Sequence, residues 1–351
     1  MRAIICYSFD GIAALTLGEL PDPVVGPGQV LIEVHAAAIS FMDTLMVAGR
    51  YQMKPAFPFA PGSDAAGVVS AVGEGVSSVR VGDRVACSHW HGGMAERMVA
   101  PESAVVRLPD GVSFEVGTTV RYAYGTARYA LDTRAQLRPG ETVFVSGAAG
   151  GVGMAAVDVA RQMGATVIAG AGSAARCEEA RQQGATHAID YAREPVRERL
   201  LELTQGRGID VYFDNVGGAL FASVSRAMAW GGRILPIGFT SGEVPRLAMN
   251  LPLLKNYSVV GCYWGAWMER QPEQARAADE QLFAAVAQGT LRPRIADVLP
   301  MASFAEAMHR LVDRQVTGRI VLRIRQSPDE VATPTTTLTT TPTTTTTGAP
   351  A

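Results

Sequence analysis

The stretch SGAAGGVGMAAV, residues 146–157, follows the apolar segment TVFV and opens a run with helical spacing. Within it, Ala148 to Gly153 fit the pattern G-x-G-x-x-G, with alanine in the first glycine position. In such a turn Gly150 lets the backbone approach a pyrophosphate, and Gly153 lets the helix pack closely on the strand. Free N–H groups at the helix start attract phosphate. We therefore expect a dinucleotide to bind this turn through Ala149, Gly150, Gly151, Val152 and Gly153.

The surrounding pattern strengthens this interpretation, because glycines also occur in ordinary turns. From about Glu141, short apolar strands alternate with helical segments, one pair in about every 20 to 25 residues. This rhythm predicts an α/β fold with a doubly wound parallel sheet, covered by helices on both faces, over residues 123–264. The expected strands are TVFVSG, TVIAGA, HAID, IDVYFD, RILPIG and YSVVGCYW; the expected helices are 152–163, ARCEEARQQG, PVRERLLELTQG and ALFASVSRAMAWGG.

The sequence on either side of this region has a different pattern. Residues 1–122 are rich in β-branched residues and turn formers, which predicts a small antiparallel barrel or sandwich. Residues 265–325 end in the strand GRIVLRI and are expected to pack back onto that first domain, making it discontinuous. Residues 326–351 are low-complexity Thr and Pro, so we predict a disordered tail, with docking or glycosylation as alternative roles.

Bulk composition excludes several classes of partner. The 351 residues are 48% hydrophobic and carry a net charge of −2, without the basic stripe of a nucleic-acid-binding protein. The sequence has no apolar run long enough to span a bilayer and no signal-peptide pattern at its N-terminus. The four cysteines are widely separated, which favours free thiols. We therefore expect a cytoplasmic protein that binds neither membrane nor nucleic acid.

The residues after the second expected strand bear on which dinucleotide binds. NAD-binding domains usually carry an acid there for the ribose hydroxyls, but this strand ends GAGSAAR without one. Ser173 and Arg176 are suited to a 2′-phosphate, and Tyr191 adds a hydroxyl on the same side. Arg176 could instead be a solvated helix residue. The missing acid favours NADPH over NADH.

Several motifs occur in the order of a known family. They are HAAAISFMDTLMVAGRY, PFAPGSDAAGVVSAVGEGVSSVRVGDRV, AAGGVG, GATHAIDY, DVYFDNVGG and GRIVL. Together they resemble the medium-chain dehydrogenase/reductase superfamily and, within it, the zinc-independent quinone oxidoreductase branch that includes zeta-crystallin. The resemblance covers residues 1–325 and implies a GroES-like catalytic domain, a Rossmann domain and an active site in the cleft between them.

The zinc-ligand positions of this superfamily separate two mechanisms. Where zinc-dependent members carry Cys and His ligands, this sequence has Ser40 and Ser63, which are poor zinc ligands. His89 and His91 stand two apart without a further ligand at the usual spacing, so we expect rim or hydrogen-bonding residues and no catalytic metal. Without a Lewis acid, reduction of an electrophilic conjugated system is easier than alcohol oxidation.

These observations predict hydride transfer from NADPH to a quinone or an enone. Two alternatives stay open: reduction of an enoyl thioester, and a crystallin-like binding role without turnover. The predicted catalytic residues are Ser40, which replaces the Asn common in the branch, Asp43 and Tyr51. Asp43 could instead cap a helix, and Tyr51, the best candidate for proton donation or quinone contact, could be a wall residue.

The resemblance and the strand ends suggest further cofactor contacts. Thr126 could orient the carboxamide or cap a helix; Trp264 could shield the nicotinamide or belong to the core; and Arg319 could lie near the cofactor or on the surface. Relatives pair the edge strand YSVVGCYW across a twofold axis, which suggests a homodimer. The further predicted cofactor contacts are Thr126, Asn215, Gly238, Phe239, Trp264 and Arg319.

Overall fold

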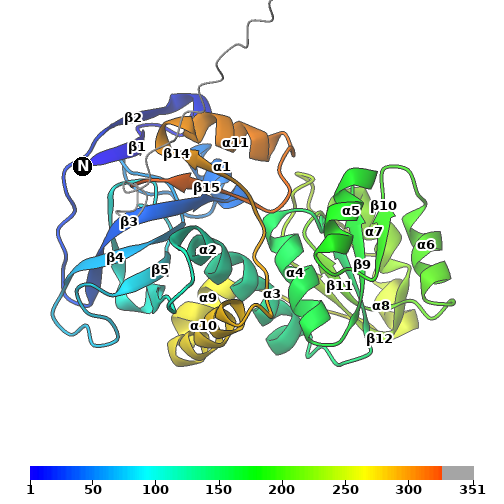
Figure 1. Cartoon of the computed structure of the whole chain (residues 1–351). Coiled ribbons are helices and arrows are strands. Elements are labelled where there is room, and N and C mark those ends of the chain that lie inside the picture. Colours follow the sequence, from blue (N-terminus) through cyan, green and yellow to red (C-terminus); the bar gives the residue numbers. More distant parts are fainter. Residues whose placement is uncertain (326–351) are drawn as a thin grey trace, which may run out of the picture.

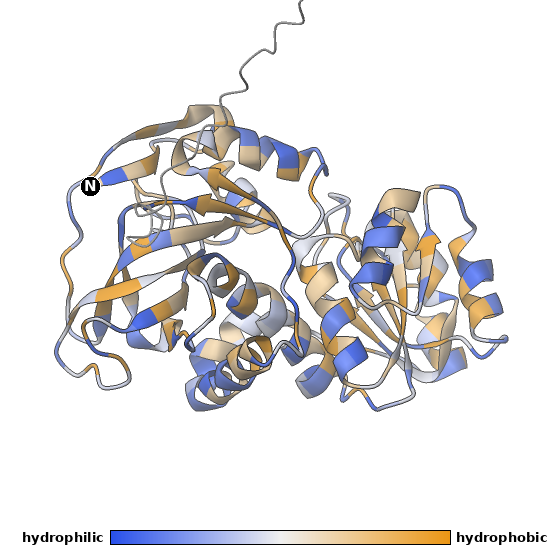
Figure 2. Cartoon of the chain, viewed as in Figure 1, coloured by the Kyte–Doolittle hydropathy of each residue, from blue (hydrophilic) through white to orange (hydrophobic). Residues whose placement is uncertain are grey.

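The computed structural model describes residues 1–325, so the predicted tail lies outside the described residues. The chain forms two domains side by side, each built around its own sheet (Figure 1). Hydrophobic residues follow the strands of both sheets, and hydrophilic residues follow the outer helices (Figure 2). No helix in residues 1–325 is long and apolar enough to cross a membrane.

The Rossmann domain contains a six-stranded parallel sheet with the order β10-β9-β8-β11-β12-β13. The order reverses at β8, so the carboxyl ends of β8 and β11 form the crevice where open α/β sheets bind ligands. This arrangement confirms the predicted doubly wound α/β fold. The strands are β8 (Thr142–Ser146), β9 (Thr166–Ala171), β10 (His187–Asp190), β11 (Ile209–Asp214), β12 (Met228–Pro236) and β13 (Ser258–Val259).

Alternation along the strands places hydrophobic residues on both faces of this sheet. Val143 and Val145 pack with α4 and α5, whereas Phe144 and Tyr212 pack with α6 and α7 on the other face. The helices are α4 (Gly151–Gln162), α5 (Ala174–Gln182), α6 (Val196–Leu203), α7 (Gly218–Ser225) and α8 (Asn250–Lys255).

The other domain is GroES-like and contains a seven-stranded sheet with the main order β14-β15-β3-β4-β5-β7, while β6 pairs with β3. The C-terminal β15 pairs antiparallel with β3, so the last described segment returns to the first domain. The sheet strands are β3 (Gln29–Ile39), β4 (Asp64–Val72), β5 (Arg84–Ser88), β6 (Arg97–Pro101), β7 (Val105–Arg107), β14 (Ile295–Pro300) and β15 (Arg319–Arg323). Its other elements include the hairpin of β1 (Arg2–Cys6) and β2 (Leu15–Glu19), and helices α1 (Phe41–Val47) and α11 (Phe304–Val312).

One continuous helical segment leads from the first domain into the second. It comprises α2 (Phe114–Thr119), a π-helical turn at Val120–Tyr124, α3 (Gly125–Arg128) and a second π-helical turn at Tyr129–Arg134. Such turns often occur at functional sites. The return path uses α9 (Trp264–Arg270) and α10 (Pro272–Ala287).

Two predicted boundaries were wrong. The helix expected over ALFASVSRAMAWGG ends at Ser225, because the backbone from Ala227 onward pairs with the start of β11 and becomes β12. The strand expected over YSVVGCYW is two residues long, β13, because the chain leaves the sheet and enters α9 at Trp264.

Candidate active site

The glycine turn between β8 and α4 presents backbone rather than side chains. Gly150 is the N-cap of α4 and is exposed, and the first N–H groups of a helix lack intrahelical partners. A Cβ on Gly153 would overlap the Gly147 carbonyl oxygen, so the tight turn requires glycine at this position. A Cβ on Gly150 would meet the same oxygen at 3.4 Å, which leaves room for a ligand to approach.

The GroES-like domain contacts this turn directly. The Gly318 N–H donates to the Ala149 carbonyl at 2.9 Å, and Gly318 forms a β-bridge with Gly150. This contact brings Arg319 beside Gly151, where a Cβ would overlap the arginine side chain. Arg319 is 6% exposed and is therefore not a surface residue. Its buried Nε has no hydrogen-bond partner.

The residues predicted for the 2′-phosphate lie along the ends of β9 and β10. The Ser173 side chain caps α5 and accepts from the Arg176 backbone N–H at 3.4 Å. Tyr191 follows β10 and is half-buried, with its ring against Gly172. Burial raises the pKa of Tyr191, while Arg314 and Arg176 partly oppose that shift.

Arg314 was missed by the sequence reasoning. Arg314 follows α11 in the GroES-like domain. Its guanidinium donates to the Thr240 carbonyl at 3.2 Å, so the side chain reaches across to the Rossmann domain. Its charge acts on Tyr191 from a different element than Arg176. Sequence spacing carries no signal for this placement, since the charge of Arg314 acts on Tyr191 only in the folded chain.

Asn215 and its neighbours form the carboxyl edge of β11 and β12. Asn215 donates its side-chain amide to the Ser146 carbonyl at 2.9 Å, which orients it across the switch point. The buried Asp214, also missed from sequence, accepts from the Ser146 and Tyr212 hydroxyls at 2.8 and 2.7 Å. Gly238 and Phe239 follow β12, and Phe239 is 40% exposed.

The opposite wall of the cleft contains a buried hydroxyl–carboxylate cluster. Ser40 and Asp43 form a capping box at the start of α1: the Ser40 N–H and hydroxyl donate to Asp43 Oδ2 at 2.7 and 2.8 Å. The Ser63 backbone N–H donates to Asp43 Oδ1 at 3.1 Å, and the Ser63 and Ser40 hydroxyls lie 3.3 Å apart. Burial raises the pKa of Asp43 to about 6, although these donors oppose the shift.

A second buried carboxylate lies next to this cluster. Asp64 accepts from Arg319 at 2.7 Å and from the Ser88 hydroxyl at 2.7 Å. Burial raises the pKa of Asp64 as well, but the Arg319 guanidinium stabilises its charged form. The donors to Asp43, in contrast, are neutral N–H and O–H groups.

A cavity of about 220 Å³ lies where the two domains meet. Three predicted site residues line it: Tyr51, Thr126 and Trp264. Ser63 also lines it, whereas Ser40 and Asp43 lie behind Ser63 and are 3% and 0% exposed. The other lining residues include Met42, Ser88, His89, Trp90, Tyr122, Ile237, Cys262, Tyr263, Met268 and Glu269.

Aromatic and titratable groups shape this cavity. Trp264 packs edge-on against Tyr122 at 5.9 Å, and Gly125 leaves room for the indole. Burial raises the pKa of Tyr51 to about 12. Burial lowers the pKa of His89 to about 4, so this imidazole is neutral at pH 7.

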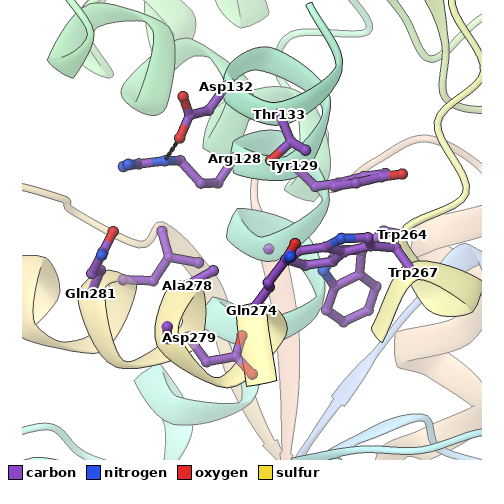
Figure 3. Close-up of a pocket in the computed structure, with 13 residues that line it drawn as sticks. Arg128, Tyr129, Asp132, Thr133, Trp264, Trp267, Gln274, Ala278, Asp279 and Gln281 are labelled. Carbon is purple, nitrogen blue, oxygen red and sulfur yellow. Dashed lines mark hydrogen bonds and ion pairs between the residues drawn. The ribbon is translucent and has the colours of Figure 1, made fainter. Parts of the chain in front are cut away.

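A second pocket, of about 270 Å³, lies among α3, α9 and α10 (Figure 3). Tyr129 stacks on Trp267 at 4.8 Å, and the Arg128–Asp132 ion pair lies at its edge. Trp264 is the one predicted site residue that lines it. The predicted residues therefore gather in the first cavity and along the Rossmann crevice.

The expected metal-free site can be compared with the described residues. Within residues 1–325, no group of three or more His, Cys, Asp or Glu side chains could hold a metal ion. His89 and His91 have ring centroids 6.1 Å apart, and burial lowers the pKa of both.

Two family models match the chain. A GroES-like alcohol dehydrogenase domain matches residues 26–110, and a zinc-binding dehydrogenase domain matches residues 151–280. The "Quinone oxidoreductase-like protein 2 homolog" of Nematostella vectensis is 36% identical over 328 residues, covering 93% of this chain and 89% of that protein.

Solved structures show the same architecture over the same part of the chain. A quinone oxidoreductase of Pseudomonas syringae pv. Tomato DC3000 is 31% identical with a TM-score of 0.86, covering 92% of this chain and 100% of that one. The Escherichia coli quinone oxidoreductase complexed with NADPH is 27% identical with a TM-score of 0.84, again covering 92% and 100%.

Proposed function

Because the chain is an oxidoreductase of the medium-chain dehydrogenase/reductase superfamily, with quinone oxidoreductase-like relatives, we propose that it reduces a quinone or another conjugated carbonyl with NADPH and without zinc. The observation that carries the proposal is the cleft itself. A side-chain-free phosphate turn stands on one wall, and a cavity lined by hydroxyl and aromatic groups opens beside it.

The residues present fit NADPH. The cradle at Gly150 admits a phosphate, and the unpartnered Nε of Arg319 lies beside the same turn. Ser173, Arg176 and Tyr191 provide donors, and β9 ends without an acid that would repel a 2′-phosphate. When bound, NADPH supplies a hydride from its nicotinamide ring. The proposed remaining contacts are Ala149, Gly151, Val152, Gly153, Thr126, Asn215, Gly238, Phe239 and Trp264.

The chain's own residues then bind, orient and desolvate the acceptor. Tyr51 and Trp90, whose rings lie 6.4 Å apart, form an aromatic wall for a planar acceptor. Ser63, Ser88 and Trp264 are buried parts of the cavity wall, and an acceptor bound against them would displace water and strengthen hydrogen bonds to a developing oxyanion. Thr126 provides a further hydroxyl on this wall.

Ser40 does not take over the position of the family's asparagine amide in this cavity. Its hydroxyl is bonded to Asp43 and lies against Ser63, and it does not line the cavity. The polar contact on that side of the cavity therefore comes from Ser63. Asp43 serves as a helix cap and as the carboxylate partner of both serines.

The test is NADPH consumption with a small para-quinone, compared with NADH and with a control lacking acceptor. We expect turnover that favours NADPH. An enoyl thioester reduced faster than any quinone or enone would replace the proposed acceptor with that alternative substrate. Tight NADPH binding without turnover of any of these acceptors would overturn the reductase and favour the crystallin-like binding role.

We also propose that the chain acts in the cytoplasm as a homodimer. Exposed apolar residues gather on the contacting elements α8, β12 and β13: Trp230 is 74% exposed, Leu253 81% and Leu254 67%. The edge of β13 offers unpaired backbone groups to a second copy of the chain. Sedimentation velocity should show a dimer that Leu253→Glu dissociates, and a wild-type monomer would contradict this proposal.

A further inference from the structure

The serine hydroxyls that line the cavity differ in the buried groups that they contact. Ser63 and Ser88 both line the cavity, and both lead to a buried carboxyl. From Ser63 the shorter path continues to the Ser40 hydroxyl at 3.3 Å, which donates to Asp43 Oδ2 at 2.8 Å, while Asp64 Oδ2 lies farther from the Ser63 hydroxyl, at 3.5 Å. From Ser88 it ends at Asp64, 2.7 Å away.

The two carboxyls have different charge partners. Asp64 is held by the Arg319 guanidinium at 2.7 Å, and a buried carboxyl with such a partner is stabilised as the anion. Asp43 is completely buried and is contacted by neutral donors. Burial raises the pKa of Asp43 despite these donors and the more distant Arg319, so Asp43 can store a proton, whereas Asp64 is stabilised as an anion by its direct ion pair.

We propose that Ser63 donates the proton that completes substrate reduction and that Ser40 and Asp43 resupply it. This inference rests on the proposed reductase function, and it assigns the proton source that the function requires. Ser63 is the catalytic residue in this relay because it reaches the cavity, while Ser40 and Asp43 act through it.

The proton and electron balance is complete. Hydride transfer brings two electrons to the acceptor and leaves negative charge on its oxygen. In the protonated acid the Asp43 O–H donates to the Ser40 hydroxyl, which reverses the bond that the ionised carboxylate accepts. The Ser63 O–H bond then breaks as the substrate O–H bond forms, Ser63 takes the Ser40 proton, and Ser40 takes the Asp43 carboxyl proton. The transfers are coupled, so no serine alkoxide accumulates. After product release, water in the cavity returns one proton to Asp43 by the reverse path.

The groups around Asp43 set the pH range of the relay. Burial raises the pKa of Asp43 to about 6, the Asp64 carboxylate adds to the shift, and Arg319 opposes it. Tyr51 and Tyr122 also face Asp43, but burial raises the pKa of both, so they are neutral at pH 7. The protonated fraction of Asp43 therefore falls as pH rises through about 6.

Tyr51 suits this role less well than Ser63 does. Burial raises its pKa to about 12, and a serine hydroxyl is not intrinsically a stronger acid, so the difference between the two residues is one of connection. Ser63 leads through the Ser40 hydroxyl to a buried carboxyl that can resupply its proton. Tyr51 packs against Trp90 and remains a substrate-contact residue.

The experiment compares Ser63→Ala with Ser63→Thr, which keeps a hydroxyl, and with Ser225→Ala, which removes a buried hydroxyl far from the cleft. We expect kcat for an enone to fall about 100-fold in Ser63→Ala, and by less than about 5-fold in the other two, since general acids contribute about 10²- to 10⁴-fold. NADPH affinity, measured by fluorescence, should be unchanged in all three. In Asp43→Asn, which retains a capping side chain, the decline of kcat above pH 6 should disappear.

Isotope-edited infrared spectroscopy of the apoprotein gives a readout besides activity. A protonated carboxyl band should be lost as pH rises through about 6 and should be absent from Asp43→Asn. Unchanged turnover in Ser63→Ala, or an Asp43 that is ionised down to pH 4, would overturn the relay alone. Failure of the wild-type chain to reduce any quinone or enone would overturn the proposed function and the relay together.

Discussion

The two walls of the cleft bind their partners with different parts of the chain. The Rossmann wall exposes backbone at Gly150 and excludes side chains at Gly153, so its function is set by steric space. The GroES-like wall presents Ser63 to the cavity and buries Ser40 and Asp43 behind it, so its function is set by hydrogen bonds and protonation. Cofactor binding at the Rossmann wall should therefore be sensitive to added side-chain atoms, and activity at the GroES-like wall should be sensitive to the removal of polar groups.

Arg319 belongs to both walls. It lies beside Gly151 of the phosphate turn and forms a buried ion pair with Asp64 of the opposite wall. Because Gly318, which directly precedes β15, also donates to the turn, the cofactor site and the hydroxyl cluster are held in a fixed relative position. This connection suggests the first and largest test.

Arg319→Met should reduce the free energy of unfolding by about 3–5 kcal/mol at pH 7, because it leaves Asp64 buried without a cation. Urea denaturation measures the loss. Arg310→Met is the matched control: its pair with Asp297 is partly exposed, so we expect a loss of at most about 1 kcal/mol. The double variant of Asp64→Asn with Arg319→Met should recover most of the stability. Equal losses in the two single variants would contradict the buried-pair argument.

Substitutions at two glycines of the same turn should affect the stability of the fold and the binding of NADPH differently. Gly153→Ala places a Cβ against the Gly147 carbonyl, so we expect a loss of about 1–3 kcal/mol in the free energy of unfolding together with weaker NADPH binding. Gly150→Asp places a good N-cap residue in open space, so stability should change by less than about 1 kcal/mol.

The Gly150→Asp carboxylate should nevertheless abolish NADPH binding by repelling phosphate. Thermal unfolding and NADPH titration of both variants provide the comparison. Wild-type NADPH affinity in Gly150→Asp would show that the phosphates bind elsewhere.

The Rossmann wall was predictable from sequence for a physical reason. A backbone cradle requires glycine at particular spacings along one short segment, so GAAGGVG carries its own signal. The strand–helix rhythm likewise reflects local periodicity, and it predicted the parallel sheet correctly. The strand predicted over YSVVGCYW was too long. Its apolar residues are compatible both with a strand and with the segment that leads into α9, and tertiary pairing decides between the two.

For the GroES-like wall, the sequence predicted individual candidate residues but not the contacts that connect them. Ser40 and Asp43 were identified by motif, but the hydrogen bond from the Ser63 N–H to Asp43 joins residues twenty apart that come together only in the folded chain. Sequence reasoning used Ser63 as the mark of a missing zinc ligand and gave it no role of its own. Arg314 and Asp214 were missed because their partners lie on other strands or in the other domain.

A substitution of Arg176 tests whether a side chain binds the 2′-phosphate on the Rossmann wall, where the glycine turn binds phosphate through its backbone. Arg176→Ala should weaken NADPH binding by about 10- to 100-fold and leave NADH binding nearly unchanged, since a bond to a charged group contributes about 1.5–3 kcal/mol. Arg181→Ala, on the same helix and paired with Glu178, is the control and should affect neither cofactor. Isothermal titration with both cofactors measures the effect. Equal losses for NADPH and NADH in Arg176→Ala would mean that Arg176 does not contact the 2′-phosphate.

The smallest expected effect is a pH dependence of the stability that distinguishes Asp43 from Asp64. A carboxyl whose pKa is raised on folding binds a proton more tightly in the folded state, so its contribution to stability is lost as pH rises through the folded pKa. For Asp43 that pKa is about 6, and the loss between about pH 5 and pH 8 should be about 1–2 kcal/mol. Asp43→Asn removes this titration and keeps the other buried acids, so its urea midpoint should fall less over the same range. If the two pH profiles are parallel, Asp43 is ionised in the folded chain throughout and its neutral donors suffice to hold the charge; in that case the difference between Asp43 and the arginine-paired Asp64 is one of geometry and not of protonation.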